Sequence, residues 1–394
     1  MQFTEIAYLY IRTNFTNFFH MAVTELIILI SCFLGGLLGT YFIIPKIINV
    51  VTYKQLMDNP NERSSHSELI PSLGGVAFYI FITLGLFLLE DFDSTNISMS
   101  LVCGLLILFV VGLKDDLVVI GPLTKLGAQV LASVFVITNP HYHFKALYTA
   151  IGIAPINEYL SMILIIFLMV YIINAFNLID GIDGLASVVG IVIFTTYAIL
   201  FFLLGRYYFF GVSLIAIGCL ISFLRYNLSN DKKIFMGDTG SMVLGFVVAV
   251  MTVRIFSYEP SVISKLPFQL ENLPLIVMAI LIVPLFDTSR VFAVRILERK
   301  KPFSADRNHI HHLLIDYLKF SHKRASLFIG IANAVFAAIF LLFGVNYSNI
   351  TLLIIMTLCI CLFLFFFFRI DFSYKNLRRR ITVRNRLEKS FKRR

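Results

Sequence analysis

Five aspartates stand at the ends of long apolar segments, where charged side chains are least expected. They are Asp115 and Asp116 after CGLLILFVVGLK, Asp180 and Asp183 in NAFNLIDGIDGLA, and Asp238 in KKIFMGDTGSMVLGF. A carboxylate at the centre of a bilayer costs about 2.5–3.5 kcal/mol on insertion scales, so such acids indicate function. Carboxylates that converge repel each other unless a cation keeps them ionised. Since Mg²⁺ and Mn²⁺ prefer oxygen ligands, and Mg²⁺ shares its coordination with substrate phosphates, the pattern predicts metal-dependent phosphate chemistry.

The segment NAFNLIDGIDGLA places Asn177, Asp180 and Asp183 three residues apart, so neighbouring pairs share a face if the segment is helical. Gly181 and Gly184 weaken a helix and let the backbone approach a ligand closely. The structural alternative is that these acids cap a break between two helices. We favour a ligand site, because a cap needs one acid and not two acids with an asparagine.

Asp115 and Asp116 are adjacent, and Lys125 follows about ten residues later, near the start of the next apolar segment. Adjacent residues on a helix point about 100° apart, so one carboxylate can bind a metal while the other faces a different partner. The alternative is a pair of solvated carboxylates in a turn.

Asp238 opens an apolar segment in the run FMGDTGS. It could be a helix N-cap with Ser241 three residues on. The glycines on either side instead favour a backbone pressed against a bulky ligand. Phe235 could stack on a base, or it could lie at the membrane interface.

Three histidines occur within four residues, His309, His311 and His312, two residues after Arg307. The H-x-H-H spacing matches no common zinc motif, and Arg307 favours recognition of an anion or a sugar amide. The alternative is an ordinary solvated loop. Asp287, inside an apolar segment, has Arg290 three residues later, which favours an internal ion pair over a role in the site.

Two further sequence features are weaker evidence of a functional site. The pair Gly74-Gly75 at the start of an apolar segment could offer backbone N–H groups to a phosphate. The five cysteines all lie in apolar segments without metal or disulfide spacing, so we expect small core residues.

The elements that position these residues are apolar helices. The mean hydropathy is +0.86 and only 14% of residues are charged, which excludes an ordinary soluble domain. We expect an all-α, polytopic membrane bundle of about eleven transmembrane helices. The predicted spans are 24–45, 73–89, 98–113, 126–139, 160–177, 185–204, 208–224, 241–257, 274–296, 326–345 and 350–368. The span at 126–139 is short enough to suit a buried or re-entrant helix as well.

The Lys and Arg residues set the orientation, because cytoplasmic loops are enriched in them. With the N-terminus outside, most of these residues and all five aspartates fall on the cytoplasmic side, and the C-terminus lies in the cytoplasm. The predicted parts are an interfacial segment 1–23, a catalytic membrane domain 24–368 and a basic tail 369–394. The expected cytoplasmic loops are 46–72, 114–125, 225–240 and 298–325. The basic tail follows a span directly, so we expect it to contact membrane lipid and no nucleic acid.

In this order, the motifs resemble those of the polyprenyl-phosphate N-acetylhexosamine-1-phosphate transferases over about residues 24–370. The form PFSADRNHIHH looks like the WecA and TagO branch, with the MraY branch more distant. The resemblance implies transfer of a HexNAc 1-phosphate, most simply GlcNAc-1-phosphate, from a UDP-sugar to undecaprenyl phosphate. UMP is released, Mg²⁺ or Mn²⁺ is the cofactor, and the lipid-linked product begins a cell-envelope glycan such as O-antigen. A bacterial inner membrane with the site facing the cytoplasm is also implied.

The resemblance assigns roles residue by residue. Asp115 and Asp116 match the acids proposed to engage the lipid phosphate and the metal, and Asp238 matches a metal ligand. The residues matched to substrate binding are Asn177, Asp180, Asp183, Asn227, Phe235, Arg307, His309, His311 and His312. The loop LSNDKKI after Asn227 is more charged than the family pattern, which weakens the assignment of Asn227.

The chemistry agrees with the resemblance. A phosphate acceptor needs little proton transfer, so catalysis should come from positioning and charge neutralisation, with Lys125 adding positive charge. We expect direct attack, with a covalent intermediate on Asp115 as the alternative. The rival class is a cation-coupled transporter, which also places acids near broken helices. The oligomeric state is left open, with a homodimer as one arrangement.

Overall fold

The computed structural model describes residues 23–58, 70–297, 299, 309–365 and 369. Within these residues the protein is an all-α, multi-pass membrane protein, and seven helices are long and apolar enough to cross a bilayer. They are α2 (Val23–Tyr53), α4 (Ser98–Leu117), α7 (Glu158–Leu178), α8 (Leu185–Leu203), α9 (Tyr207–Asn227), α10 (Gly237–Ser257) and α15 (His322–Asn346).

Other apolar helices are shorter or bent. The shorter ones are α3 (Gly75–Leu88), α5 (Pro122–Ile137) and Asn349–Phe365. An eighth span is possible if α12 (Leu273–Ile280) and α13 (Ile282–Leu297) count as one, although the pair is bent by 71°. Every predicted span overlaps one of these helices, while a total of eleven crossings and the orientation of the termini remain predictions.

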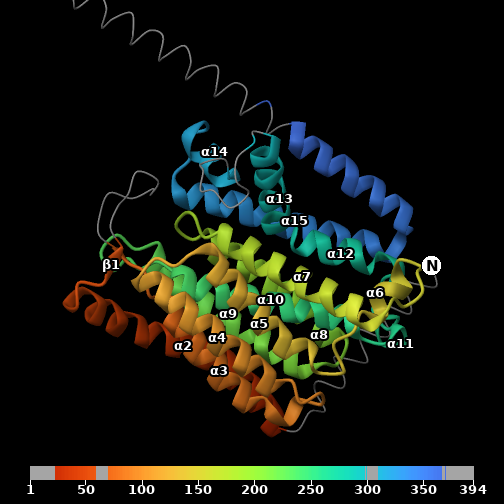
Figure 1. Ribbon diagram of the computed structural model, residues 1–394, viewed down its shortest axis with the longest axis horizontal. Coiled ribbons are helices and arrows are strands. Elements are labelled where there is room, and N and C mark those ends of the chain that lie inside the picture. The colour runs from red at the N-terminus through yellow and green to blue at the C-terminus, as the bar shows by residue number, and fades with distance from the viewer. Residues whose placement is uncertain (1–22, 59–69, 298, 300–308, 366–368, 370–394) are drawn as a thin grey trace, which may run out of the picture.

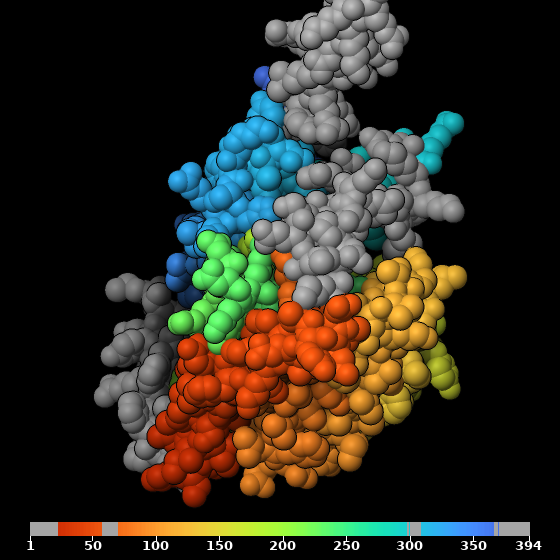
Figure 2. Space-filling model, turned by 90° about the vertical axis from the view of Figure 1, so that its left-hand side faces the viewer, coloured from red at the N-terminus to blue at the C-terminus, as the bar shows by residue number. Residues whose placement is uncertain are grey.

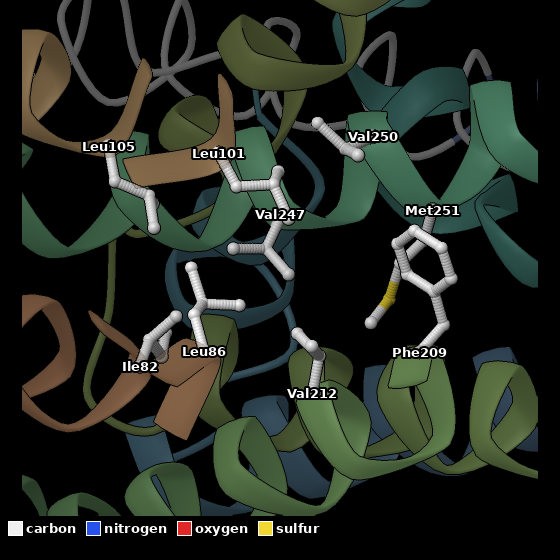
Figure 3. Close-up of a pocket in the computed structure, with 9 residues that line it drawn as sticks. All are labelled: Ile82, Leu86, Leu101, Leu105, Phe209, Val212, Val247, Val250 and Met251. Atoms are coloured by element: carbon white, nitrogen blue, oxygen red, sulfur yellow. The ribbon is translucent and has the colours of Figure 1, made fainter. Parts of the chain in front are cut away.

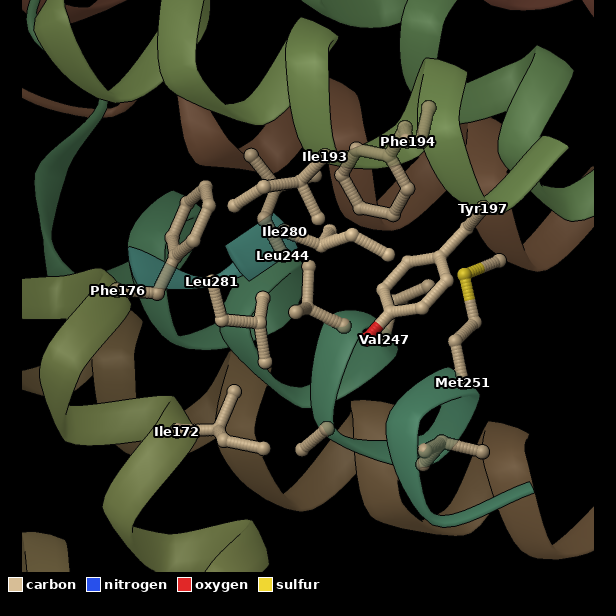
Figure 4. Close-up of a cluster of buried hydrophobic side chains, with 14 of the residues drawn as sticks. Ile172, Phe176, Ile193, Phe194, Tyr197, Leu244, Val247, Met251, Ile280 and Leu281 are labelled. Carbon is tan, nitrogen blue, oxygen red and sulfur yellow. The ribbon is translucent and has the colours of Figure 1, made fainter. Parts of the chain in front are cut away.

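Helix α10 lies at the centre of the bundle, and α3, α4 and α7 pack around it (Figure 1). Every side chain from Thr239 to Ser257 is buried. The helix is rich in glycine, serine, threonine and valine, and such small residues let neighbouring helices approach closely. The core shown in Figure 4 joins α7, α8, α10 and α12, and within it the Tyr197 hydroxyl pairs with Thr252 Oγ1 at 2.6 Å. The central helix therefore holds Asp238, at its first turn, in a fixed place.

The core leaves little free space around α10. A void of about 10 Å³ lies between α3, α4, α9 and α10, lined only by apolar side chains (Figure 3). A cavity needs about 10–15 Å³ to hold one water molecule, so this void is packing space and not a ligand site.

The break between α12 and α13 is stabilised from outside the bent pair. Asn333 on α15, fully buried, donates to the carbonyl of Ile280 and accepts from the nitrogen of Val283. Buried backbone groups freed by a break must find such partners in a membrane. As a result α13 leaves the line of α12 and runs toward α14 (Ile310–Asp316) (Figure 1).

Several boundaries differ from expectation. The predicted cytoplasmic loop 114–125 is partly helical, because α4 continues through both of its aspartates to Leu117 and α5 begins at Pro122. A proline suits this first helical position because its missing N–H would be unpaired there anyway. The predicted loop 298–325 contains α14, and its residues 300–308 lie outside the described ranges, as do 1–22 and 370–394.

The remaining elements are short. They are β1 (Met57–Asp58), β2 (Ile70–Pro71), α6 (Lys145–Ala150), α11 (Pro260–Ile263) and the 3₁₀ turns Glu90–Phe92 and Leu270–Asn272. Strands β1 and β2 pair antiparallel. All five cysteines are unpaired, and two of them, Cys32 and Cys219, are buried as expected. The expectation of a core position is wrong for Cys361, which is exposed on the last described helix.

Candidate active site

Asp238 lies at the meeting point of three helices. Its Oδ1 accepts a hydrogen bond from Asn177 Nδ2 on α7 at 2.6 Å, and its Oδ2 contacts the ammonium of Lys125 on α5. Ser241, one turn later on α10, also accepts from Asn177, at 2.7 Å. The structure thus brings together two predicted site residues more than fifty positions away from Asp238 in the sequence.

Lys125 contacts a second carboxylate, that of Asp115, in addition to Asp238. Its Nζ lies 2.6 Å from Asp115 Oδ2, and the Asp115 side chain is only 11% exposed. Asp115 Oδ1 accepts from the nitrogen of Ile120 at 2.8 Å, which holds the chain turn after α4. In this structure the positive charge of Lys125 offsets the repulsion between the two carboxylates.

Asp116 caps the N-terminus of α10. Its Oδ1 accepts from the nitrogen of Asp238 at 2.7 Å, and its Oδ2 accepts from the nitrogen and the hydroxyl of Thr239 at 3.0 and 2.5 Å. Gly237, with φ of 72°, supplies the left-handed turn into the helix. At Gly112 on α4 a Cβ would lie 2.6 Å from Cα of Thr239, so only glycine permits this close approach. An acid from one span therefore satisfies the free N–H groups of another.

Asp180 is the acid without a partner. No hydrogen bond or ion pair to its carboxylate occurs within the described ranges, although Asp238, Asp116 and Asp183 act on it electrostatically. Burial and these three neighbouring carboxylates raise the pKa of Asp180 to about 8. A positive charge placed here would reverse the effect of the neighbours.

Asp183 ties the glycine-rich turn to two other segments. Its Oδ2 accepts from Lys233 Nζ at 2.6 Å and lies 3.0 Å from His322 Nδ1, at the start of α15. Ser326 donates to the carbonyl of Asp183 at 2.7 Å. Burial alone would raise the pKa of Asp183, but the hydrogen bonds from His322 and Lys233 outweigh it and lower the pKa.

Sequence reasoning did not single out His322 or Lys233. Their sequence neighbourhoods carry no signal for this pairing, because it depends on how the loop after α9 lies against α15. In Figure 2 a green segment, coloured as the end of α9 and the residues after it, lies between the red α2 and the light blue α14.

Asn227 bridges two backbone segments. Its Oδ1 accepts from the nitrogen of Gly184 at 2.5 Å, and its Nδ2 donates to the carbonyl of Ile234 at 2.8 Å. The residue is 5% exposed. This geometry supports a structural role for Asn227 and gives no support to the predicted contact with substrate.

The amides of Gly74 and Gly75 are also occupied. They donate to the carbonyls of Phe235 and Met236 at 3.0 and 2.9 Å. The suggestion that they offer N–H groups to a phosphate is therefore wrong for this conformation. Phe235 itself is partly buried, and the ammonium of Lys233 lies 5.5 Å from the centre of its ring.

The three histidines are buried, and the ring of His311 lies against Gly181 of the glycine-rich turn. His309 Nδ1 lies 2.8 Å from Asp287 Oδ2, and the rings of His309 and His311 are stacked with centres 5.6 Å apart. Burial, with His312 as the next cause, holds the pKa of His311 well below its ordinary value. The predicted ion pair of Asp287 with Arg290 is confirmed at 3.2 Å, whereas Arg307 lies outside the described residues.

Comparison with known proteins narrows the interpretation. The model of glycosyl transferase family 4 matches residues 98–256, which contain all five aspartates. The decaprenyl-phosphate N-acetylglucosaminephosphotransferase of Mycolicibacterium smegmatis is 31% identical over 293 residues, covering 68% of this chain and 71% of that protein. The chain belongs to the polyprenyl-phosphate N-acetylhexosamine-1-phosphate transferase family.

Other members agree with this assignment. The probable undecaprenyl-phosphate N-acetylglucosaminyl 1-phosphate transferase of Bacillus subtilis is 28% identical over 317 residues, covering 79% of this chain and 84% of that protein. The undecaprenyl-phosphate alpha-N-acetylglucosaminyl 1-phosphate transferase of Escherichia coli O157:H7 is 28% identical over 300 residues, covering 72% and 75%. The resemblance inferred from the motifs is confirmed, and the transporter alternative has no support among these relatives.

Proposed function

We propose that the protein transfers GlcNAc-1-phosphate from UDP-GlcNAc to undecaprenyl phosphate and releases UMP. The observation that carries the proposal is the convergence of Asp115, Asp116, Asp180 and Asp238 at one end of the central helix. Relatives named as polyprenyl-phosphate GlcNAc-1-phosphate transferases support the same reaction. The product would be a lipid-linked pyrophosphoryl sugar that begins a cell-envelope glycan.

The reaction is a displacement at phosphorus. An oxygen of the lipid phosphate attacks the sugar-linked phosphorus, and the bond from that phosphorus to the oxygen shared with UMP breaks. The electron pair leaves with UMP, so no proton transfer is required at the acceptor. Positioning and charge stabilisation then account for catalysis. We propose direct attack; isolation of a phosphorylated enzyme formed from UDP-GlcNAc without lipid would replace it by a covalent route.

The donor set fits a divalent cation. Within the described ranges no three His, Cys, Asp or Glu side chains are already arranged as a metal site, and Lys125 lies between two of the acids. Asp180 has no hydrogen-bond or ion-pair partner within the described ranges, and burial together with the neighbouring carboxylates raises its pKa, which indicates a shortage of positive charge at this point. Oxygen ligands of this kind suit Mg²⁺ or Mn²⁺. When bound, the cation would neutralise charge on the pyrophosphate.

We assign the cation to Asp238 and Asp116, as the sequence predicted, and add Asp180. Asp116 Oδ1 accepts one helix-capping hydrogen bond and keeps a second lone pair for a cation, whereas its Oδ2 already accepts two hydrogen bonds from Thr239. Lys125 and Asp115 lie beside this point, and we place the lipid phosphate there because an ammonium can stabilise the charge that moves between the phosphates.

The UDP-sugar would lie between the glycine-rich turn, Phe235 and the histidines. Phe235 offers a ring for the base, with Lys233 beside it. Asn177 already donates to Asp238, so it would fix that carboxylate for the pyrophosphate. His309, His311, His312 and Arg307 would recognise the sugar phosphate, as the family motif implies.

The chain of the acceptor requires an apolar surface next to the site. An apolar cavity of about 110 Å³ lies between α13, α14, α15 and the helix Asn349–Phe365. Its lining includes Phe286 and Ile310, which neighbour Asp287 and His309 in the sequence. We propose that isoprene units of undecaprenyl phosphate occupy it, because an apolar cavity of comparable size stays dry and takes hydrocarbon ligands.

We further propose that the protein lies in the bacterial inner membrane with the site facing the cytoplasm. The excess of Lys and Arg on the side of the five aspartates supports this orientation.

The test uses the purified full-length protein with UDP-GlcNAc, undecaprenyl phosphate and Mg²⁺. We expect UMP and a GlcNAc-pyrophosphoryl lipid in equal amounts, and neither product when lipid or metal is omitted. A panel of UDP-sugars identifies the preferred amino sugar. Absence of UMP under all these conditions, while the protein binds cations, would favour a transporter instead.

A further inference from the structure

Asp287 is a buried acid outside the set already described. It lies on α13, shortly after the break from α12, and it is 3% exposed. Its Oδ1 accepts from Arg290 Nη2 at 3.2 Å and from the nitrogen of Ile310 at 3.0 Å. Its Oδ2 lies 2.8 Å from His309 Nδ1. An acid buried this deeply is retained only when several donors compensate for its lost hydration.

Two of these donors belong to the histidine motif: the side chain of His309 and the backbone nitrogen of Ile310. His309 is the N-cap of α14 and Ile310 is its first helical residue. Asp287 therefore binds the imidazole and the first backbone N–H of the helix that carries His311 and His312. A carboxylate on Nδ1 makes that nitrogen the donor and leaves Nε2 as the atom available for other partners.

The histidine motif in turn contacts the glycine-rich turn. The ring of His311 stacks with that of His309, and its Nε2 has no hydrogen-bond partner among the residues that the structure describes. A Cβ at Gly181 would lie 2.3 Å from this nitrogen, so the ring packs directly against the backbone next to Asp180. A continuous set of contacts thus runs from Asp287 through the histidines to the turn that bears Asp180.

We infer that Asp287 is a positioning residue for the UDP-sugar: it sets the orientation of His309 and the start of α14. This inference rests on the proposed function, because it concerns the same site. Asp287 itself does not touch substrate; it acts through His309. The break between α12 and α13 matters for this contact, because it directs α13 toward α14 and so brings Asp287 next to His309.

The test is a double-mutant cycle between Asp287→Asn and His309→Ala. Each single variant should lower kcat/KM for UDP-GlcNAc by about 10–100-fold, the usual effect of removing a partner that orients a histidine. The double variant should be no worse than His309→Ala alone, because the two residues act through one another. The KM for undecaprenyl phosphate should stay unchanged. Multiplied losses in the double variant would overturn the inference.

Two controls separate positioning from folding. Thr288→Val alters the next residue of α13, which is equally buried and whose hydroxyl has no partner in the described part of the chain. This variant should behave as the parent protein. Ile310→Pro removes the backbone donor to Asp287 while leaving both Asp287 and His309 in place; it also changes a side chain of the apolar cavity, so only its effect on UDP-GlcNAc is compared. A proline suits the first helical position, and His309 already has the extended φ of −62° and ψ of 152° that suits a residue before proline.

Ile310→Pro should reduce kcat/KM for UDP-GlcNAc by less than Asp287→Asn does, and add nothing to it when the two are combined. An effect of Ile310→Pro that multiplies with that of Asp287→Asn would count against the inference. If Asp287→Asn does not fold, the pair Ile310→Pro and His309→Ala gives the same cycle.

Calorimetric binding of UDP-GlcNAc keeps this test distinct from the reaction itself. If the parent protein releases no UMP, the proposed function fails, but the cycle can still be measured from dissociation constants. If the parent is active and the losses simply multiply, only the role of Asp287 fails.

Discussion

The carboxylate of Asp116 accepts a hydrogen bond from the backbone nitrogen of Asp238 at 2.7 Å. Two acids more than a hundred residues apart are thus joined through the first turn of α10. The free N–H groups at that turn attract negative charge, so the same contact stabilises the helix and draws the two carboxylates together. The start of α10 and the proposed cation site therefore both depend on the contact between Asp116 and Asp238.

This contact allows the two roles of Asp116 to be separated. Asp116→Asn keeps a side chain that can cap a helix but removes the charge, whereas Asp116→Ala removes both. We expect Asp116→Ala to lower the free energy of unfolding by about 0.5–2 kcal/mol, and Asp116→Asn to change it little. Both should lose most of their Mg²⁺-dependent UMP release. Normal turnover in Asp116→Asn would restrict Asp116 to capping.

Lys125 should affect turnover and metal affinity in opposite directions. Its ammonium lies between Asp115 and Asp238, where it compensates for their charge and competes with a cation. We expect Lys125→Met to lower kcat by about 100-fold, as removal of a charge-stabilising donor does. The same variant should bind Mg²⁺ more tightly in the absence of substrate. Weaker Mg²⁺ binding, measured by calorimetry, would show that Lys125 helps to build the metal site.

The apolar cavity can be tested by filling it. Ala332 lines the cavity on α15, and Ala332→Phe would exclude isoprene units. We expect the KM for undecaprenyl phosphate to rise about 10-fold, equivalent to fewer than two buried methylene groups, with the KM for UDP-GlcNAc unchanged. Leu327→Phe, on an exposed position of the same helix, is the matched control. An unchanged lipid KM in Ala332→Phe would place the chain elsewhere.

The lowered pKa of His311 leads to a prediction of how the stability of the protein depends on pH. Burial and His312 keep its folded pKa well below the ordinary value, so it stays neutral in the folded protein. The unfolded chain takes up a proton near pH 6.5 and the folded one does not. The free energy of unfolding should therefore fall as the pH drops below about 6.5, by at most about 1.4 kcal/mol per pH unit from this group.

The comparison with His311→Gln isolates that contribution. Thermal unfolding in detergent between about pH 5.5 and 7.5 should show a steeper loss for the parent protein than for the variant. Parallel profiles would mean that His311 becomes protonated in the folded state.

The sequence allowed the acids and the apolar helices to be predicted, because each is a local pattern: a charge at the end of an apolar run, or a glycine-rich turn. The break at Leu281 had one local signal, Pro284, whose missing N–H leaves the carbonyl of Ile280 without a helical donor. Its geometry was still not predictable, because Asn333 from another helix supplies the remaining hydrogen bonds. The structural role of Asn227 and the partners of Asp183 were missed for the same reason. Each depends on segments far apart in the sequence that meet only in the folded bundle.

The ion pair of Asp287 and Arg290 was predictable from its spacing on one helix face, whereas the contact of Asp287 with His309 was not. That contact requires α13 to turn toward α14. Motifs therefore indicated the candidate groups for the chemistry, and tertiary contacts determine which of them lie against each other.

The central claim is that acids from distant segments hold one divalent cation at the start of α10. Electron paramagnetic resonance of Mn²⁺ with the purified protein tests it most directly. We predict one bound Mn²⁺ per chain, displaced by Mg²⁺ and lost in a folded Asp238→Asn variant together with UMP release. Mn²⁺ binding that is absent in the parent protein, or unchanged in Asp238→Asn, would contradict the account.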